Sequence, residues 1–138
     1  MKRTILLLGA IIVAVSMCGC TSHPVMNLQG YSVPSLEDGS LQSAEAVQNA
    51  IITACKVRGW TPKVVNEGLI QAEIDIRAKH RAVVEIPFTS TEYSIIYKDS
   101  EGMEYEQKSG KIHRNYNRWV TMLSQTIQRE LGVKSQRF

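Results

Sequence analysis

The chain is poor in the residues and motifs that most often mark an active site. It has three cysteines, three histidines and two tryptophans among 138 residues. It has no phosphate-binding glycine loop, no cysteine pair at zinc spacing, no His-Glu helix of a metalloprotease and no nucleophile elbow. The enzyme classes that those motifs define are therefore excluded, and we expect no catalytic activity, no metal and no cofactor.

Long hydrophobic runs are also scarce. The main one, residues 4–15, has twelve residues and follows Lys2 and Arg3. A helix that crosses a bilayer core needs roughly 20 apolar residues, and polar residues follow from Thr21. A positive head before a short apolar core is typical of a signal peptide, which we predict over residues 1–19 and expect to be cleaved. An uncleaved transmembrane anchor is the alternative.

Residues 17–20, Met-Cys-Gly-Cys, resemble the bacterial lipobox. The resemblance implies cleavage before Cys20, a diacylglycerol thioether on its sulfur and usually an acyl group on its new amine. Two or more acyl chains hold a protein stably in a membrane, at about 0.8 kcal/mol per buried methylene. The residue after the cysteine is Thr21 and not aspartate. In enterobacterial-type systems, this resembles the pattern of lipoproteins that are delivered to the outer membrane. We therefore expect a protein that is lipid-anchored in a bacterial cell envelope, in the outer membrane and facing the periplasm.

Loss of the signal peptide changes what charge and cysteine content imply. Lys2 and Arg3 leave with it, so the mature chain has 16 − 2 = 14 basic and 13 acidic residues, a net charge of +1. This balance gives no support to a nucleic-acid partner. Because Cys18 is removed and Cys20 is acylated, Cys55 remains alone and no intramolecular disulfide can form. Its place on the apolar side of a predicted helix favours a buried structural thiol over a catalytic one.

The mature chain divides into a stalk, one domain and a short tail. Residues 20–40 contain prolines, glycines and polar residues without a sustained period, which predicts a flexible stalk behind the lipidated N-terminus. Residues 41–132 are enough for one modest core. Residues 133–138 are expected to form a C-terminal tail.

Two segments of the domain have the three- and four-residue apolar spacing of helices. The first covers residues 44–55, and the second has an apolar stripe over residues 116–131. The first helix is predicted to begin at an N-cap, Ser40 or Ser43, and to end at Gly59. The second is predicted to have Asn115 as its N-cap and to end at Gly132.

Between the helices the apolar spacing changes to alternation, which predicts strands. They are expected near residues 60–65, 70–77, 81–88 and 93–98, with 104–107 as a candidate edge strand. The order helix, three to four antiparallel strands, helix predicts a two-layer α+β sandwich with both helices on one sheet face. The alternative is one helix docked at the sheet edge.

The two central strands can be aligned as a hairpin. With Ile74 opposite Val84, one face of the pair becomes continuously apolar. The same alignment sets Arg77 opposite Arg81, which is an unfavourable pairing at the tip.

Candidate chemical groups are few. His113 is the best-placed general base, with Glu104 or Glu106 as an orienting partner if the loop folds back; an exposed loop histidine is the favoured interpretation. Three carboxylates on neighbouring strands are predicted on the solvent face of the sheet: Glu73, Asp75 and Glu85. A solvated surface is favoured there over an acid–base pair.

Two basic groups are more suggestive. The first surrounds the predicted hairpin tip: Arg77, Lys79, His80 and Arg81. It could contact anionic lipid or a cell-wall polymer, although a solvated turn is favoured. The second, which follows Lys108 and leads into the second helix, supplies the candidate partner-binding residues: Lys111, His113, Arg114, Asn117 and Arg118. Its positive side chains oppose the helix dipole, and the opening turn of the helix could offer free backbone N–H groups to an anion.

Two blocks resemble a known family. They are residues 93–100, Tyr-Ser-Ile-Ile-Tyr-Lys-Asp-Ser, and residues 111–120, Lys-Ile-His-Arg-Asn-Tyr-Asn-Arg-Trp-Val. The patterns Tyr-Lys-Asp-Ser and Asn-Tyr-Asn-x-Trp-Val resemble those of a family of small, uncharacterised proteobacterial lipoproteins, over roughly residues 44–131. Arg114 stands where many relatives have proline. The resemblance implies an envelope location and no catalytic residue or cofactor.

The function expected from the sequence is therefore a non-catalytic, lipid-anchored module that binds an envelope protein or a cell-wall partner. The alternative is a small-ligand carrier with a pocket between the sheet and the second helix, near Tyr93, Tyr97 and Trp119. An enzyme that uses His113 is the least favoured.

Overall fold

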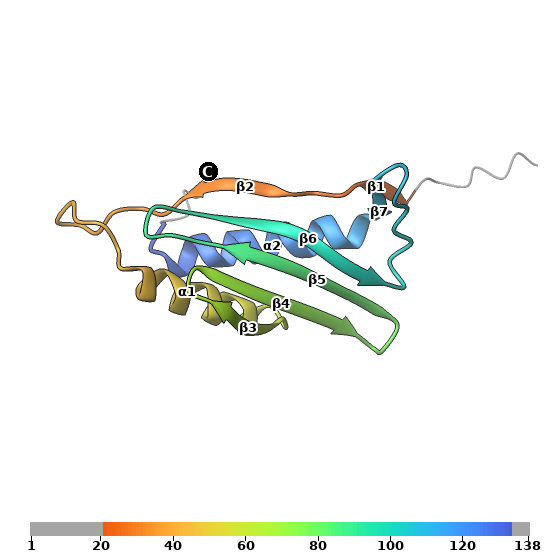
Figure 1. Cartoon of the computed structure of the whole chain (residues 1–138), viewed down its shortest axis with the longest axis horizontal. Helices are drawn as coiled ribbons and strands as arrows, with labels where there is room; N and C mark the ends of the chain where they lie inside the picture. The colour runs from red at the N-terminus through yellow and green to blue at the C-terminus, as the bar shows by residue number, and fades with distance from the viewer. Residues whose placement is uncertain (1–20, 134–138) are drawn as a thin grey trace, which may run out of the picture.

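The structure is a computed structural model that describes residues 21–133 (Figure 1). The predicted signal peptide, Cys20 and residues 134–138 lie outside the described residues. The elements follow in this order: β1 (Ser22–Pro24), β2 (Leu28–Ser32), α1 (Ala44–Val57), β3 (Thr61–Asn66), β4 (Leu69–Ile76), β5 (His80–Pro87), β6 (Glu92–Glu101), β7 (Lys111–His113) and α2 (Arg114–Glu130). No helix between residues 21 and 133 is long and apolar enough to cross a membrane.

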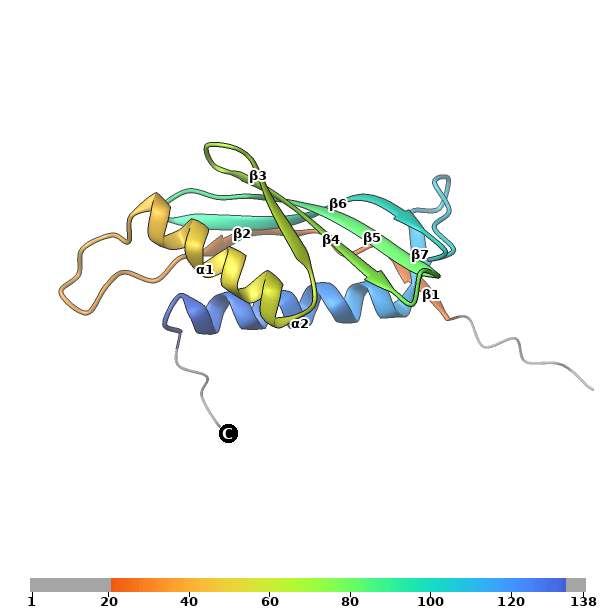
Figure 2. The same cartoon turned by 90° about the horizontal axis from the view of Figure 1, so that it is seen from below.

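Five antiparallel strands form the main sheet in the order β2-β6-β5-β4-β3, and β1 pairs with β7 in a separate two-stranded sheet. Both helices lie against the same face of the main sheet (Figure 2). The predicted α+β sandwich is therefore confirmed. The main sheet has one strand more than the three to four expected, because β2 comes from the segment predicted to be a stalk.

The core lies between the helices and the inner face of the sheet. Alternate residues of β4 and β5 point inward and meet the apolar stripes of both helices. The fully buried side chains include Val47 and Ile51 of α1, Val120, Leu123 and Ile127 of α2, and Ile70, Ala72, Val84 and Ile86 of the sheet. Burying one such aliphatic side chain other than alanine is worth about 1.5–3 kcal/mol, so this layer supplies most of the driving force for folding.

The helix α1 begins and ends where the sequence predicts. The hydroxyl of Ser43 accepts a hydrogen bond from the N–H of Ala46 at 3.0 Å, which is N-cap geometry. Gly59, just past the helix, has a φ of 78°, a left-handed conformation that glycine adopts without steric cost. Cys55 is fully buried, as predicted, and burial raises the pKa of its thiol to about 12.

The register of the β4–β5 hairpin differs from the predicted one by two residues. Ile74 pairs with Ala82, not with Val84. The difference arises in the turn, which lies one residue earlier than predicted, over residues 77–79, where Arg77 and Ala78 adopt positive φ angles of 57° and 53°. The predicted apolar face is nevertheless correct, because a shift of two residues returns every side chain to the same side of the sheet.

The prediction of a flexible stalk over residues 20–40 is wrong for residues 22–33. β1 pairs with β7, β2 extends the sheet beside β6, Leu28 packs on the core and Val33 is buried. These strands have only three and five residues, and β2 contains a register shift near Gly30, whose φ is 65°. Neither strand is long or regular enough to produce the sustained alternation by which sequence patterns reveal strands.

The region between β6 and α2 also differs from expectation. No strand forms at residues 104–107, where Glu104 has a positive φ of 54° and turns the chain. The short strand is β7 instead. The N-cap of α2 is His113 and not Asn115, since the Nδ1 atom of His113 accepts the N–H of Asn115 at 3.2 Å. The predicted end of the helix near Gly132 is confirmed by its φ of 91°.

Candidate functional site

One end of the domain gathers elements that lie far apart in the sequence. β1, β7, the start of α2, the β4–β5 turn and the β6–β7 loop meet there (Figures 1 and 2). We call this region the basic end and define it as residues 21–24, 76–80 and 101–118. It includes Thr21, the residue that follows Cys20 in the chain.

The N-terminal segment is bound to α2 at this end. The N–H of Arg114 donates to the carbonyl of Thr21 at 2.9 Å. The side chain of Asn117 then bridges two further backbone groups. Its Oδ1 accepts the N–H of Met26 at 2.9 Å, and its Nδ2 donates to the carbonyl of Pro24 at 2.9 Å. The chain is therefore attached to the folded domain from Thr21 onward.

The β4–β5 turn is joined to the same end through the β6–β7 loop. The N–H of His113 donates to the carbonyl of Met103 at 2.8 Å. Next to Met103, Gly102 packs on the backbone carbonyl of Lys79 so closely that a Cβ atom would not fit, and its φ is 67°. The carbonyl of Gly102 lies 2.9 Å from Nδ1 of His80. The two basic groups, which are far apart in the sequence, thus belong to one surface.

The basic end differs in charge from the rest of the domain. Its six basic side chains are Arg77, Lys79, Lys108, Lys111, Arg114 and Arg118. Its three acidic side chains are Glu101, Glu104 and Glu106. The net charge of this end is 6 − 3 = +3, whereas the other described residues have 6 basic and 10 acidic side chains, a net charge of −4. The described domain is therefore electrically polar, with its positive end beside the residue that follows Cys20.

The candidate partner-binding residues fall into two groups. Three are exposed at the basic end: Lys111, Arg114 and Arg118. The other two have structural contacts, since His113 caps α2 and Asn117 holds the N-terminal segment. Two N–H groups of the first turn, expected to be free for an anion, already donate to the Thr21 carbonyl and the His113 ring. The exposed side chains, rather than the helix start itself, are available to a partner.

Among the described residues, the ring of His113 makes no hydrogen bond or ion pair with Glu104 or Glu106, the carboxylates considered as its orienting partners. Its Nδ1 atom accepts a backbone N–H, which fixes the ring in a capping role. Glu106 accepts a hydrogen bond from the hydroxyl of Ser109 at 2.8 Å, within its own turn.

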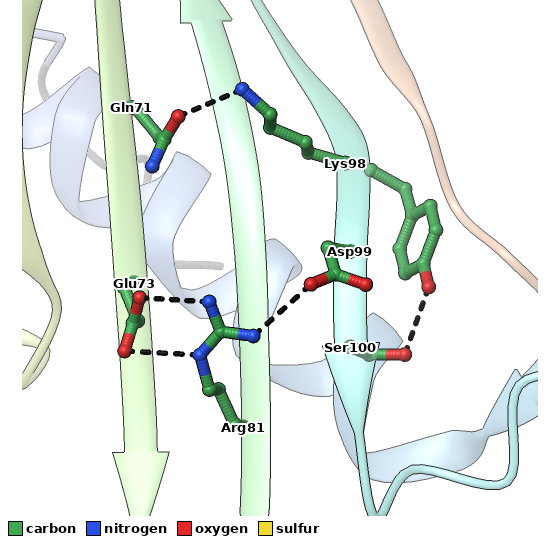
Figure 3. Close-up of polar contacts among 7 residues, drawn as sticks. Gln71, Glu73, Arg81, Lys98, Asp99 and Ser100 are labelled. Carbon is green, nitrogen blue, oxygen red and sulfur yellow. Dashed lines mark hydrogen bonds and ion pairs between the residues drawn. The ribbon is translucent and has the colours of Figure 1, made fainter.

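The outer face of the sheet is solvated and charged, as predicted (Figure 3). Nε of Arg81 lies 3.1 Å from Glu73, and its Nη1 lies 3.1 Å from Asp99, contacts that raise the pKa of the guanidinium. Nζ of Lys98 lies 2.9 Å from Glu85. The carboxylates of Glu73 and Glu85 are therefore paired with cations on an open surface.

The observed register also removes a repulsion that the sequence predicted on the outer face. Arg81 lies opposite the exposed Asp75 and not opposite Arg77, so the unfavourable contact expected at the hairpin tip does not form.

The three aromatic residues proposed to line a ligand pocket do not meet in one cavity. Tyr93 is a core residue whose hydroxyl lies 2.9 Å from Oγ of Ser124 and accepts Nε2 of Gln128 at 2.9 Å. Tyr97 lines a hollow beside the β6–β7 loop. Trp119 is partly buried against the core.

The structure places a larger groove elsewhere, along β2 and α2. Its volume is about 660 Å³. Met26, Leu28 and Tyr31 contribute from the N-terminal segment, and Thr121, Gln125 and Gln128 from α2. The groove could not be predicted from the sequence because part of its wall comes from the supposed stalk, through Met26, Leu28 and Tyr31. Apolar and aromatic residues are unusual in a solvated linker. Their presence in that segment was the signal in the sequence from which the groove could have been predicted.

Among residues 21–133 no group of three or more histidine, cysteine, aspartate or glutamate side chains is placed to hold a metal ion. Comparisons with protein-family models, curated proteins and solved structures found no match to this chain.

Proposed function

We propose that the protein is a lipid-anchored domain of the bacterial cell envelope that acts as a non-catalytic interaction module. The observation that carries this proposal is the predicted signal peptide at residues 1–19, whose cleavage would leave a lipidated Cys20 directly before Thr21. The proposed location is the outer membrane, facing the periplasm. Membership of the small proteobacterial lipoprotein family suggested by the sequence is part of the same proposal.

The β2–α2 groove is the surface best suited to a protein partner. It combines exposed apolar side chains, such as Tyr31 at 40% and Val133 at 39% exposure, with amide and guanidinium groups of α2, including Gln125 and Arg129. Apolar floors with polar rims are typical of protein interfaces. It lies toward the C-terminal half of α2, away from the basic end, so a domain anchored at Cys20 leaves it accessible.

Two experiments test the two parts of this function. Wild-type protein is expected to float with envelope membranes and to carry the mass of a diacylglyceryl group, whereas Cys20→Ser is expected to lose both. A photoreactive residue at Gln125 should crosslink a discrete envelope protein in intact cells. The same residue at the exposed position Glu67, in the β3–β4 turn, is the matched control. Equal crosslinking at both positions would contradict a partner at the groove.

A small-ligand carrier is the second candidate, and the size of the groove favours it. A volume of about 660 Å³ lies within the range of roughly 300–1,000 Å³ that small-molecule sites occupy. Native mass spectrometry of the mature protein extracted from membranes should then show a bound adduct. Gln125→Trp, which fills the groove, should remove that adduct, and an adduct that persists in this variant would place the ligand elsewhere.

A further inference from the structure

We propose that the basic end of the domain rests on the anionic phospholipid headgroups of the membrane that holds Cys20. This inference depends on the proposed lipidation of Cys20 and adds to it an orientation and a binding surface. It rests on two observations: Thr21, which follows Cys20 in the chain, is already bound to the folded domain, and the charge is unevenly distributed over the domain.

The covalent distance between the lipid and the domain is short. Thr21 is hydrogen-bonded through its carbonyl to the N–H of Arg114, and Ser22 already pairs with His113 in the β1–β7 sheet. One extended residue spans at most about 3.6 Å. A lipid on Cys20 therefore has no stalk to hold the domain away from the bilayer, and the surface beside Thr21 must lie at the level of the headgroups.

The surface that this attachment brings to the membrane is the positive one. Arg114 follows the β1–β7 sheet directly, and Lys111 lies opposite Pro24 within it. The hairpin turn with Lys79 reaches the same end through its packing on Gly102. The rest of the described domain carries a net negative charge, so an anionic membrane attracts the basic end and repels the remaining surface.

The test uses mature lipidated protein in vesicles of phosphatidylcholine with and without phosphatidylglycerol. A single fluorophore is attached at Gln107→Cys in the basic end or, as control, at Ser35→Cys in the loop between β2 and α1, at the far end of the domain. Cys55 is buried and does not compete for the label. Quenching by a lipid with a headgroup-attached quencher reports the distance of each label from the bilayer surface.

We expect strong quenching at residue 107 and little at residue 35, and more quenching at 107 when phosphatidylglycerol is present. Removing two lysines, in Lys108→Gln/Lys111→Gln, should weaken the docked state by roughly thirtyfold. Lys56→Gln/Lys63→Gln changes the net charge equally on other surfaces and should leave the quenching as in the wild type.

Equal quenching at residues 107 and 35 in lipidated protein would overturn the orientation while leaving the lipid anchor intact. Quenching that ignores phosphatidylglycerol, or that is the same in both double variants, would overturn the role of charge. Quenching at 107 that vanishes when an anionic cell-wall polymer is added would show that the polymer, and not the membrane, occupies this surface. A mass without lipid at Cys20 would instead overturn the proposed function, and this inference with it.

Discussion

Replacing Asn117 with alanine should loosen the N-terminal segment from the rest of the domain. The Asn117 side chain makes two hydrogen bonds to backbone groups more than 90 residues away, to the N–H of Met26 and the carbonyl of Pro24, each at 2.9 Å. A typical hydrogen bond contributes about 1 kcal/mol net to stability, and a group left without a partner adds to the loss. Because Pro24 is exposed and Met26 only partly buried, water can replace part of the lost bonding.

The expected decrease in the free energy of unfolding is therefore about 2 kcal/mol, twice the contribution of one net hydrogen bond. Urea unfolding followed by circular dichroism measures it. With a slope of roughly 1–3 kcal/mol per molar urea, the midpoint should fall by about 1 M. Asn115→Ala, an exposed asparagine in the same helical turn, is the control and should change the stability by no more than about 0.5 kcal/mol. Equal midpoints for the Asn117 and Asn115 variants would refute the bridging role of Asn117.

Three further predictions concern the core, one glycine and the buried thiol. Tyr93→Phe removes a hydroxyl that is hydrogen-bonded to Ser124 and Gln128, and should lower the free energy of unfolding by about 1–2 kcal/mol in thermal or urea unfolding. Tyr116→Phe removes a buried hydroxyl without a partner among the described residues and should leave the stability unchanged or raise it. A larger loss of stability in Tyr116→Phe than in Tyr93→Phe would contradict these contacts. Gly102→Ala should destabilise the domain and increase proteolysis of the β4–β5 turn, because a Cβ atom would overlap the carbonyl of Lys79, and a variant as stable as the wild type would show that the turn packs differently. Burial raises the pKa of the Cys55 thiol from 9.0 to about 12 in the folded protein. Above pH 9 the unfolded state therefore releases a proton that the folded state keeps. The free energy of unfolding should then fall by up to about 1.4 kcal/mol per pH unit through this group. Cys55→Ala should show a shallower fall over pH 9–11, and identical slopes would exclude this contribution.

The sequence was sufficient for the elements whose apolar spacing is long and regular. α1 and α2 were predicted with ends correct to within two residues, because each combines an apolar stripe with a cap or a terminal glycine. The inner faces of β4 and β5 were also predicted, since alternation survives a shift of two residues. The register itself was not, because it depends on positive φ angles at Arg77 and Ala78, residues that rarely adopt them.

The basic end could not be assembled from the sequence, although its residues could be named. Its unity depends on three long-range contacts: Thr21 with Arg114, Met103 with His113, and Lys79 with Gly102. Nothing in local spacing encodes such pairings. The short strands β1 and β2 gain their stability from the edges that they join and not from any pattern of their own, which is why the segment before residue 34 looked like a linker.

Amide hydrogen exchange of residues 22–32 in the lipid-anchored protein tests the central claim most directly. The claim is that folded strands follow Cys20 at once, so that the domain is held against the membrane by its basic end. If so, the amides hydrogen-bonded in β1 and β2 should exchange far more slowly than an unstructured chain of the same sequence. Exchange at the rate of an unstructured chain throughout residues 22–32 would mean that a flexible stalk separates the lipid from the domain, and would contradict the account.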